Sequence, residues 1–200
     1  MTIQPNAPYM VEFLGTPEAG KTSLIKRLNE EISNTLSVGV IQESAELVPD
    51  IIPKGSIEAH FWMKYLTLSK LLEAKFSSEY DIVLVDRGII DSLMWNQYYY
   101  TTKMISKETF EYCNGFFTHS KVPYPDQVFY LTTTPRESIK RRGGEGRIVT
   151  LEFIRDFNNI VDSFMKQVNY PFFKLDTTLL SKEEKFDIVF KELSRNFHLP

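Results

Sequence analysis

One short stretch of the chain has the residue types and the spacing of a phosphate-binding loop. Four residues separate Gly15 from Gly20, and Lys21 and Thr22 follow directly. Glycines let the backbone approach an anion closely, so that successive N–H groups can point toward it. In loops of this pattern the lysine ammonium reaches the β- and γ-phosphates, and the hydroxyl is a ligand of Mg²⁺. The pattern therefore predicts that ATP and Mg²⁺ are bound by the loop residues Gly15, Thr16, Pro17, Glu18, Ala19, Gly20, Lys21 and Thr22, with Thr22 on the metal.

The segments on either side of this loop match the setting that phosphate binding requires. Residues 9–14 form an apolar run typical of a buried strand, and residues 23–28 continue with helical spacing. A helix that begins near Lys21 brings the positive end of its dipole to the anion. A glycine turn that only joins a strand to a helix is the simpler alternative, but the pattern and its setting together favour phosphate binding.

Two carboxylates and an arginine stand where other predicted strands end. Asp86 and Arg87 close one apolar run, and Glu43 closes another. Asp86 has the position of a carboxylate that holds Mg²⁺ or orients an acceptor hydroxyl, while Glu43 could accept the proton of that hydroxyl. Arg87 can clamp an anion through two parallel hydrogen bonds. The alternatives are a helix-capping Asp86, a solvated Glu43 and a surface ion pair of Arg87, and the choice of base between the two carboxylates stays open.

The most basic and glycine-dense segment of the chain predicts a lid. Residues 140–147 combine four basic residues with three glycines. Because glycines permit movement and positive charge attracts phosphates, we expect a mobile lid at about 140–148 that closes on the nucleotide and excludes water. Its candidate catalytic residues are Arg141, Arg142 and Arg147, and the sequence does not single out one of them. A solvated charged hairpin is the alternative.

A scaffold for these residues follows from the hydrophobic pattern. Short apolar runs predict strands, and apolar residues that recur every three to four positions predict helices. Strands are expected at 9–14, 37–43, 80–86, 127–131 and 171–175, and helices at 20–33, at 56–77, through 100, from 106, from 135, at about 151–168 and from 181. The segment 44–55 contains two prolines and is expected to be a loop.

The alternation of strands and helices indicates the fold class. Right-handed crossovers join parallel strands, so we expect an α/β fold in which helices flank a five-stranded parallel sheet, in one domain spanning residues 1–200. Ligands of such sheets bind outside the carboxyl ends of the strands. Gly15, Glu43, Asp86 and Asp176 all stand at those ends, so they are expected to converge on one cleft.

Aromatic residues are dense in the predicted helices, and two interpretations apply to them. In the helix 56–77, the apolar positions recur with helical spacing and predict an aromatic-rich buried face of Ile57, Phe61, Tyr65, Leu68 and Leu72. A larger aromatic set could line a flat base-binding pocket, although core packing is the default: Phe61, Trp62, Tyr65, Trp95, Tyr98, Tyr99 and Tyr100. Asp91 could contact the substrate or cap the helix that follows Asp86, and the cap is favoured. The three histidines, at 60, 119 and 198, receive no role.

The overall composition excludes some function classes. A net charge of -3 argues against a general binder of nucleic acid or membrane surfaces, which usually carries a basic excess. Cys113 is the single cysteine, so no internal disulfide forms and a reducing cytoplasm is the expected setting. The first residues lack the basic start and the apolar core of a signal peptide, and no apolar run approaches the roughly 20 residues that span a bilayer.

Together these motifs resemble the nucleoside and nucleotide monophosphate kinases among the P-loop proteins, particularly thymidylate kinases and deoxyribonucleoside kinases. The similarity rests on the loop 15–22, the Asp86–Arg87 pair and the arginine-rich segment 141–143. With residues 148–154, this segment is similar to the lid and the following helix of deoxyribonucleoside kinases. Glu43 stands where those kinases have a base at the end of a strand.

The resemblance implies a three-layer P-loop NTPase fold, ATP with Mg²⁺ as phosphoryl donor, and often a homodimer formed through helices. Asp176 resembles the turn near the adenine in such kinases, with a plain turn as the alternative. Two positions depart from the family pattern. Trp62 follows Phe61 where deoxyribonucleoside kinases have a Phe-Gln pair, and Gly88 stands where thymidylate kinases have an aromatic residue.

The expected function is transfer of the γ-phosphoryl group of ATP to a small, nucleoside-like or nucleotide-like acceptor. One alternative is a nucleotide-dependent regulatory NTPase that signals to a partner, and another is a kinase for a small molecule that is not a nucleoside. The identity of the acceptor, the choice between ATP and GTP, and the oligomeric state do not follow from the sequence.

Overall fold

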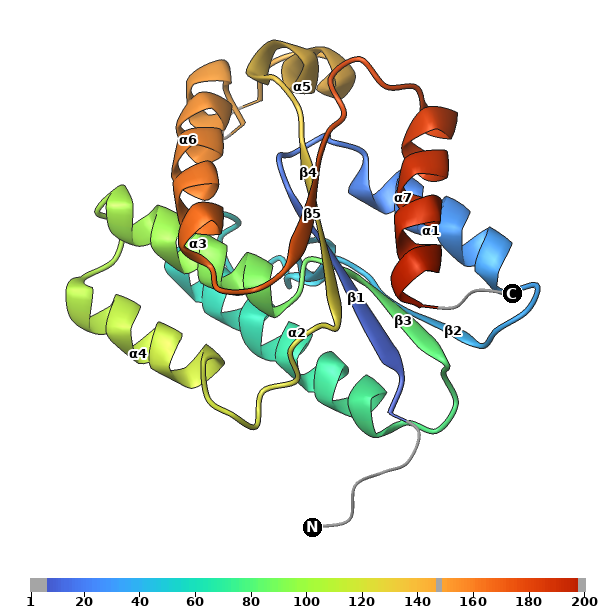
Figure 1. Cartoon of the computed structure of the whole chain (residues 1–200). Coiled ribbons are helices and arrows are strands. Elements are labelled where there is room, and N and C mark those ends of the chain that lie inside the picture. Colours follow the sequence, from blue (N-terminus) through green and yellow to red (C-terminus); the bar gives the residue numbers. More distant parts are fainter. Residues whose placement is uncertain (1–6, 147–148, 198–200) are drawn as a thin grey trace.

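Five parallel strands form one sheet, and helices cover both of its faces (Figure 1). The computed structural model describes residues 7–146 and 149–197. The strands are β1 (Tyr9–Gly15), β2 (Val38–Ile41), β3 (Ile82–Asp86), β4 (Gln127–Thr132) and β5 (Phe172–Asp176). The helices are α1 (Lys21–Ile32), the short 3-10 helix η1 (Ser44–Leu47), α2 (Ile57–Phe76), α3 (Ile89–Thr101), α4 (Lys107–Phe117), α5 (Pro135–Arg142), α6 (Leu151–Gln167) and α7 (Lys182–Asn196).

The order and direction of the strands bring the predicted site residues together at the carboxyl ends of the strands. The order is β2-β3-β1-β4-β5, and every neighbouring pair is parallel. The three middle strands are almost continuously apolar because helices cover both of their faces, and Glu12 of β1 is the one acidic residue buried within them before their ends. Since all strands run in one direction, the loops after β1 and β3 leave the sheet at the same edge.

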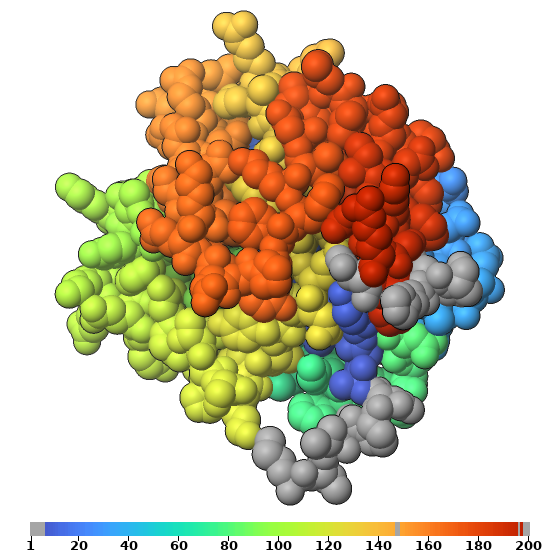
Figure 2. All heavy atoms as spheres, viewed as in Figure 1, coloured from blue at the N-terminus to red at the C-terminus, as the bar shows by residue number. Residues whose placement is uncertain are grey.

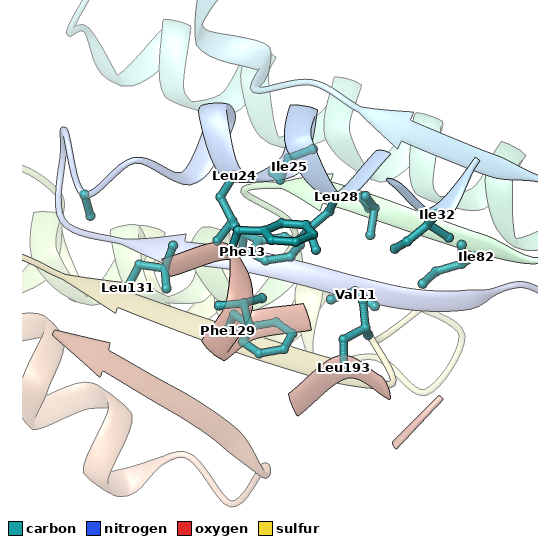
Figure 3. Close-up of a cluster of buried hydrophobic side chains, with 14 residues drawn as sticks. Val11, Phe13, Leu24, Ile25, Leu28, Ile32, Ile82, Phe129, Leu131 and Leu193 are labelled. Atoms are coloured by element: carbon teal, nitrogen blue, oxygen red, sulfur yellow. The ribbon is translucent and has the colours of Figure 1, made fainter. Parts of the chain in front are cut away.

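Each face of the sheet packs against its own helices. On one face, Phe13 of β1 stacks on Phe129 of β4, with 5.2 Å between ring centroids, and Leu28 of α1 and Leu193 of α7 pack on this cluster (Figure 3). Helices α2, α3, α4 and α6 pack against the opposite face. In the space-filling view, the C-terminal third of the chain, coloured orange to red, covers much of the front of the molecule (Figure 2).

The predicted α/β fold with a five-stranded parallel sheet is confirmed. The segment predicted to be a loop over 44–55 differs in one respect, because its first four residues form the 3-10 helix η1. In the described part of the chain, no helix combines the length and the apolarity needed to cross a bilayer.

The apolar face predicted for α2 is buried only in part, with Leu68 in the core. Tyr65 is 45% exposed and Leu72 is 36% exposed, while the buried face includes His60, Lys64 and Thr67. These three polar residues line a cavity between α2 and its neighbours, so this part of the inward face is polar rather than apolar. A period based on apolar residues therefore identified Leu68 correctly but missed the polar part of the buried face.

Candidate active site

The loop between β1 and α1 has the backbone geometry of an anion cradle. Gly15, Glu18 and Gly20 have positive φ angles of 124°, 58° and 91°. A Cβ added to Gly15 would lie 2.0 Å from the carbonyl oxygen of Leu131 in β4, so no side chain fits there. A Cβ on Gly20 would lie 2.6 Å from Nζ of Lys185 on α7. The backbone of β4 therefore accounts for Gly15, whereas Gly20 is required by its positive φ, because the Lys185 side chain near it can move.

The carbonyls of this loop are bound from outside. Ser138 Oγ of α5 donates to the carbonyl of Pro17 at 2.9 Å, and Thr177 Oγ1, after β5, lies 3.1 Å from the carbonyl of Ala19. The carbonyl of Glu18 accepts from Arg141 Nη1 at 3.3 Å. Because a peptide carbonyl and the next N–H point in opposite directions, this arrangement turns the N–H groups of Glu18 and Gly20 away from α5 and the turn after β5, whereas the N–H of Ala19 donates to the carbonyl of Thr16 at 3.2 Å.

Lys21 is a buried cation held by backbone dipoles. Its side chain is 5% exposed, and Nζ donates to the carbonyls of Gly15 at 3.4 Å and Thr16 at 3.0 Å. Burial, followed by the nearby Arg87, lowers the pKa of Lys21 to about 8, while Asp86 acts in the opposite direction. An anionic phosphate at this place would favour the charged form of the lysine.

Thr22 and Asp86 lie together, as a Mg²⁺ site requires. Thr22 Oγ1 donates to Asp86 Oδ2 at 2.5 Å, and Asp86 Oδ1 is buried without a hydrogen-bond partner among the described residues. A hydroxyl, a carboxylate and an unpaired carboxylate oxygen fit Mg²⁺, which prefers oxygen ligands and is usually held by one or two carboxylates together with substrate phosphates. The described residues contain no cluster of three or more His, Cys, Asp or Glu that could hold a metal alone.

Arg87 lies between two carboxylates beside this site. Its Nε is 2.8 Å from Glu43 Oε1, an ion pair whose N–H is not aligned for a hydrogen bond, and its Nη1 donates to Asp91 Oδ1 at 2.9 Å. Burial alone would raise the pKa of Glu43, but Arg87 and Lys21 hold it below its ordinary value. Burial raises the pKa of Asp91 in spite of Arg87. Arg87 has a φ of 65°, so its backbone is held in a strained conformation.

The start of α3 is capped by a residue from another element. Gly88 precedes this helix and supplies no side-chain cap, but the carboxylate of Glu12 in β1 accepts the N–H of Ile90 at 3.1 Å and that of Asp91 at 2.7 Å. The expectation that Asp91 caps the helix is wrong, because its own carboxylate binds Arg87. A Cβ on Gly88 would lie 2.5 Å from Glu12 Oε2, so the buried carboxylate occupies the space of a side chain at position 88.

The arginines at the end of α5 lie in different places. Arg141 donates to the carbonyls of Thr177 at 2.6 Å, Thr178 at 3.2 Å and Glu18 at 3.3 Å, and pairs with Glu137. It therefore ties α5 to the loop and to the turn after β5. Arg142 lines the cavity described below. Arg147 lies outside the described residues, and the lid predicted at 140–148 is partly outside them as well.

Asp176 stands at the carboxyl end of β5, as predicted, but does not line the cavity. Its Oδ1 accepts from the backbone N–H of Thr178 at 2.9 Å and from the hydroxyl at 2.5 Å. Its predicted role near the adenine stays a prediction. The next residue, Thr177, makes the contact with the phosphate-binding loop.

One cavity of about 1030 Å³ joins the converging residues to a chamber between helices. Its lining includes the loop from Pro17 to Ser23, together with Glu43, Arg87 and Asp91. The chamber, here called the inner chamber, is lined by His60, Met63, Lys64, Trp95, Tyr99 and Phe153. Along α3, Tyr99 lies about 12 Å beyond Asp91 at a rise of about 1.5 Å per residue, so the inner chamber extends away from the phosphate loop.

A buried polar network borders the inner chamber. Lys64 Nζ donates to the carbonyl of Ser92, and to Asn96 Oδ1 at 2.6 Å. His60 Nε2 lies 3.2 Å from the same Oδ1, and Asn96 Nδ2 donates to Asn114 at 2.9 Å. Burial lowers the pKa of Lys64 to about 7, and burial followed by Lys64 lowers that of His60 to about 2. The sequence pattern predicts no role for His60 or its partners in this network.

The chain is similar to known proteins over most of its length. A family model described as AAA domain matches residues 10–182. A structure of deoxyadenosine kinase from M. mycoides with bound dATP matches at a TM-score of 0.73 and 18% identity, covering 93% of this chain and 99% of that one. Thymidylate kinase from Candida albicans matches at a TM-score of 0.71 and 14% identity, covering 95% and 92%. No curated protein sequence matches significantly. The chain thus has the fold of the P-loop nucleoside and nucleotide kinases, as its motifs predicted.

Proposed function

We propose that this chain, which belongs to the AAA domain family, transfers the γ-phosphoryl group of ATP, with Mg²⁺, to a small nucleoside-like acceptor. The observation that carries this proposal is the single cavity that includes both the phosphate loop and the inner chamber. Its volume of about 1030 Å³ is at the upper end of ligand pockets, which are typically about 300–1,000 Å³ and hold one ligand. An NTPase that uses only water as acceptor has no need of the aromatic chamber.

In the proposed mechanism, the N–H groups of Glu18 and Gly20 in the loop and the ammonium of Lys21 bind the β- and γ-phosphates. Thr22 and Asp86 would hold Mg²⁺, which when bound neutralises charge that develops on the phosphate oxygens. The transition state of phosphoryl transfer is loose, and the protein forms no covalent bond to the phosphoryl group. Positioning of the reactants and electrostatic stabilisation therefore supply most of the catalysis.

We assign the proton-accepting role to Glu43 rather than Asp86. Asp86 Oδ2 is already bound to Thr22, whereas Glu43 lines the cavity with 31% of its side chain exposed. The lowered pKa keeps Glu43 ionised at neutral pH, so it can accept a hydrogen bond from an acceptor hydroxyl. Arg87, fixed between Glu43 and Asp91, is placed to bind an anionic or hydroxyl group of the acceptor, and Arg142 to bind the phosphates from the other side.

The proposal is tested by ATP consumption in a screen of nucleosides, nucleoside monophosphates and unrelated hydroxylated compounds. We expect an acceptor to raise ATP consumption well above the rate with water, and Lys21→Ala to abolish the stimulated rate while the circular dichroism spectrum stays unchanged. ATP hydrolysis that no small acceptor stimulates, but a protein partner does, would instead favour a regulatory NTPase. Full activity of Lys21→Ala would contradict the mechanism.

The setting of this activity is part of the proposal. The net charge of -3 and the single cysteine support action in the cytoplasm on a small molecule rather than on nucleic acid or a membrane. A single domain over 1–200 and a helix-mediated homodimer remain predictions. Exposed Tyr65, Tyr112 and Phe116 on α2 and α4 are suited to such a contact, and sedimentation analysis measures it directly.

A further inference from the structure

Two buried lysines of the cavity share one arrangement. Lys21 is 5% exposed and donates to two carbonyl oxygens, and Lys64 is 3% exposed and donates to a carbonyl and an amide oxygen. None of the ion pairs among the described residues involves either ammonium. In each case dipoles hold the cation without neutralising it, and both lysines line the same cavity.

The surroundings of Lys64 are built to keep its position. Ser92 and Asn96 stand one turn apart on α3, and the ammonium reaches both from α2. Asn96 Oδ1 can only accept, so His60 Nε2 must be the donor to it and the imidazole is neutral. The ring of Phe117 lies 5.2 Å from the ammonium on a further side. With two of its three hydrogens bound, Lys64 retains one for a guest in the cavity.

The rest of the inner chamber fits a flat ring. Trp95 lies 5.6 Å from Tyr99 and is stacked with Phe153 at 6.4 Å, measured between ring centroids. Aromatic walls bind planar groups through their faces, and a few placed polar groups determine which ring is accepted. Lys64 is the only buried cation that the described residues contribute to the inner chamber.

We propose that Lys64 determines the specificity of the acceptor site by donating a hydrogen bond to a carbonyl or carboxylate oxygen on a ring held in the inner chamber. This inference rests on the proposed function, since it names the chemical class of the acceptor. An oxygen accepts the third N–H of the ammonium, whereas an amino group at the same place presents a second donor and leaves that N–H without an acceptor. Lowering of the lysine pKa by burial is consistent with this, because an electron-rich oxygen would restore the charged form.

The test is the binding of matched nucleoside pairs, measured by calorimetry with Mg-ADP present. The two members of a pair carry either an oxo or an amino substituent at the same ring carbon. Inosine and adenosine form the decisive pair, because adenosine has no ring carbonyl, and uridine with cytidine forms a second. We expect the wild-type protein to bind the oxo member of a pair about 10- to 100-fold more tightly. Orotidine carries a carboxylate on its ring. If it binds more tightly than uridine, the oxygen that Lys64 recognises belongs to a carboxylate rather than to a carbonyl.

Lys64→Met is expected to weaken binding of the oxo compounds by at least about tenfold and to leave the amino compounds nearly unchanged. Lys70→Met, on the same helix and outside this cavity, serves as the control and is expected to change neither. Should Lys64→Met not fold, Lys64→Gln and the wild-type comparison still decide the matter. Equal loss for both members of a pair, or no oxo preference in the wild type, overturns the proposal.

Binding and catalysis separate the two proposals. Lys64-dependent binding of oxo compounds without phosphoryl transfer to any of them would contradict the proposed function and leave the role of Lys64 intact. Phosphoryl transfer to oxo and amino acceptors at equal kcat/KM, unaffected by Lys64→Met, would contradict the role of Lys64 and leave the proposed function intact.

Discussion

Glu12 and Gly88 are in close contact beside the candidate site. The carboxylate of Glu12 caps α3 from β1 and fills the space in which a side chain at position 88 would lie. Through this cap it holds Asp91, which binds Arg87, which in turn pairs with Glu43. Glu12 on β1 thus positions Glu43, the proposed base, although α1 and β2 lie between the two residues in the sequence.

Gly88→Ala is expected to lower the free energy of unfolding by about 1–3 kcal/mol, because the added Cβ meets a carboxylate that two N–H groups hold in place. Gly115→Ala is the matched control. A Cβ there has no atom within 4 Å, and alanine should raise helix stability by about 1 kcal/mol. Urea denaturation of both variants measures the difference. Equal effects of the two substitutions would contradict the close packing of Glu12 on Gly88.

The pH dependence of stability provides a second test of Glu12. Burial raises its pKa to about 7, so the folded state favours the protonated form. Protonated Glu12 therefore contributes to the free energy of unfolding. This contribution is complete below the pKa that Glu12 has in the unfolded chain, and it is lost as the pH rises through about 7. We expect the unfolding free energy of the wild type, relative to Glu12→Gln, to fall by about 3 kcal/mol between pH 4 and pH 8. A difference that does not vary with pH would show that Glu12 is not buried as described.

At the scale of elements, two neighbouring arginines at the end of α5 have different roles. Arg141 binds three carbonyls and joins α5 to the phosphate loop and to the turn after β5, whereas Arg142 lines the cavity. The two residues differ by about 100° around a helix, which is sufficient to turn one toward the scaffold and the other toward a ligand.

We therefore expect opposite outcomes for Arg141→Ala and Arg142→Ala. The first should destabilise the protein by about 1–3 kcal/mol, because it leaves carbonyls without donors. The second should lower kcat by up to roughly 10³-fold with little change in stability, as for arginines that stabilise the transition state of phosphoryl transfer. Thermal unfolding and steady-state kinetics of the pair measure both effects. A stability loss for Arg142→Ala with unchanged kcat would contradict this division.

Helix α2 shows how a cavity alters an element. Its polar residues His60, Lys64 and Thr67 recur at helical spacing and point inward, while aromatic Tyr65 lies on the outside. A polar stripe of this kind is the signal by which the inner chamber could have been recognised in the sequence. It carries little weight alone, since polar stripes usually face solvent.

At the scale of the whole molecule, the phosphate loop joins parts that are distant in sequence. The loop contacts β4, α5, α7 and the turn after β5, so a bound nucleotide connects most of the sheet edge. Mg-ATP at 100 times its Kd should stabilise the folded state by about 2.7 kcal/mol. For a chain of this size, this corresponds to a rise in Tm of about 5–10 °C.

Differential scanning calorimetry with and without Mg-ATP measures this rise. Lys21→Ala is expected to lose most of it, and Lys26→Ala, an exposed lysine on the same helix, should retain it. A wild-type Tm that does not respond to any Mg-nucleotide would contradict the assignment of the loop.

Local sequence patterns were sufficient to predict much of the secondary structure and the phosphate-binding loop of this molecule. The loop 15–22, the strands and most helix limits follow from glycine spacing, apolar runs and caps, all of which act between residues close in the chain. The alternation of strands and helices predicts the parallel sheet, and the shared direction of its strands is sufficient to place Asp86 near Thr22.

Only the tertiary structure decided which side chains meet across elements. The cap of α3 by Glu12, the separate positions of Arg141 and Arg142, and the network of Lys64 with Asn96 depend on contacts between residues far apart in sequence. A sequence period reports whether a position is apolar, but not whether the space it faces is core or cavity. The free energy of a buried charge is determined by its neighbours in three dimensions, and for Lys64 those neighbours come from other helices.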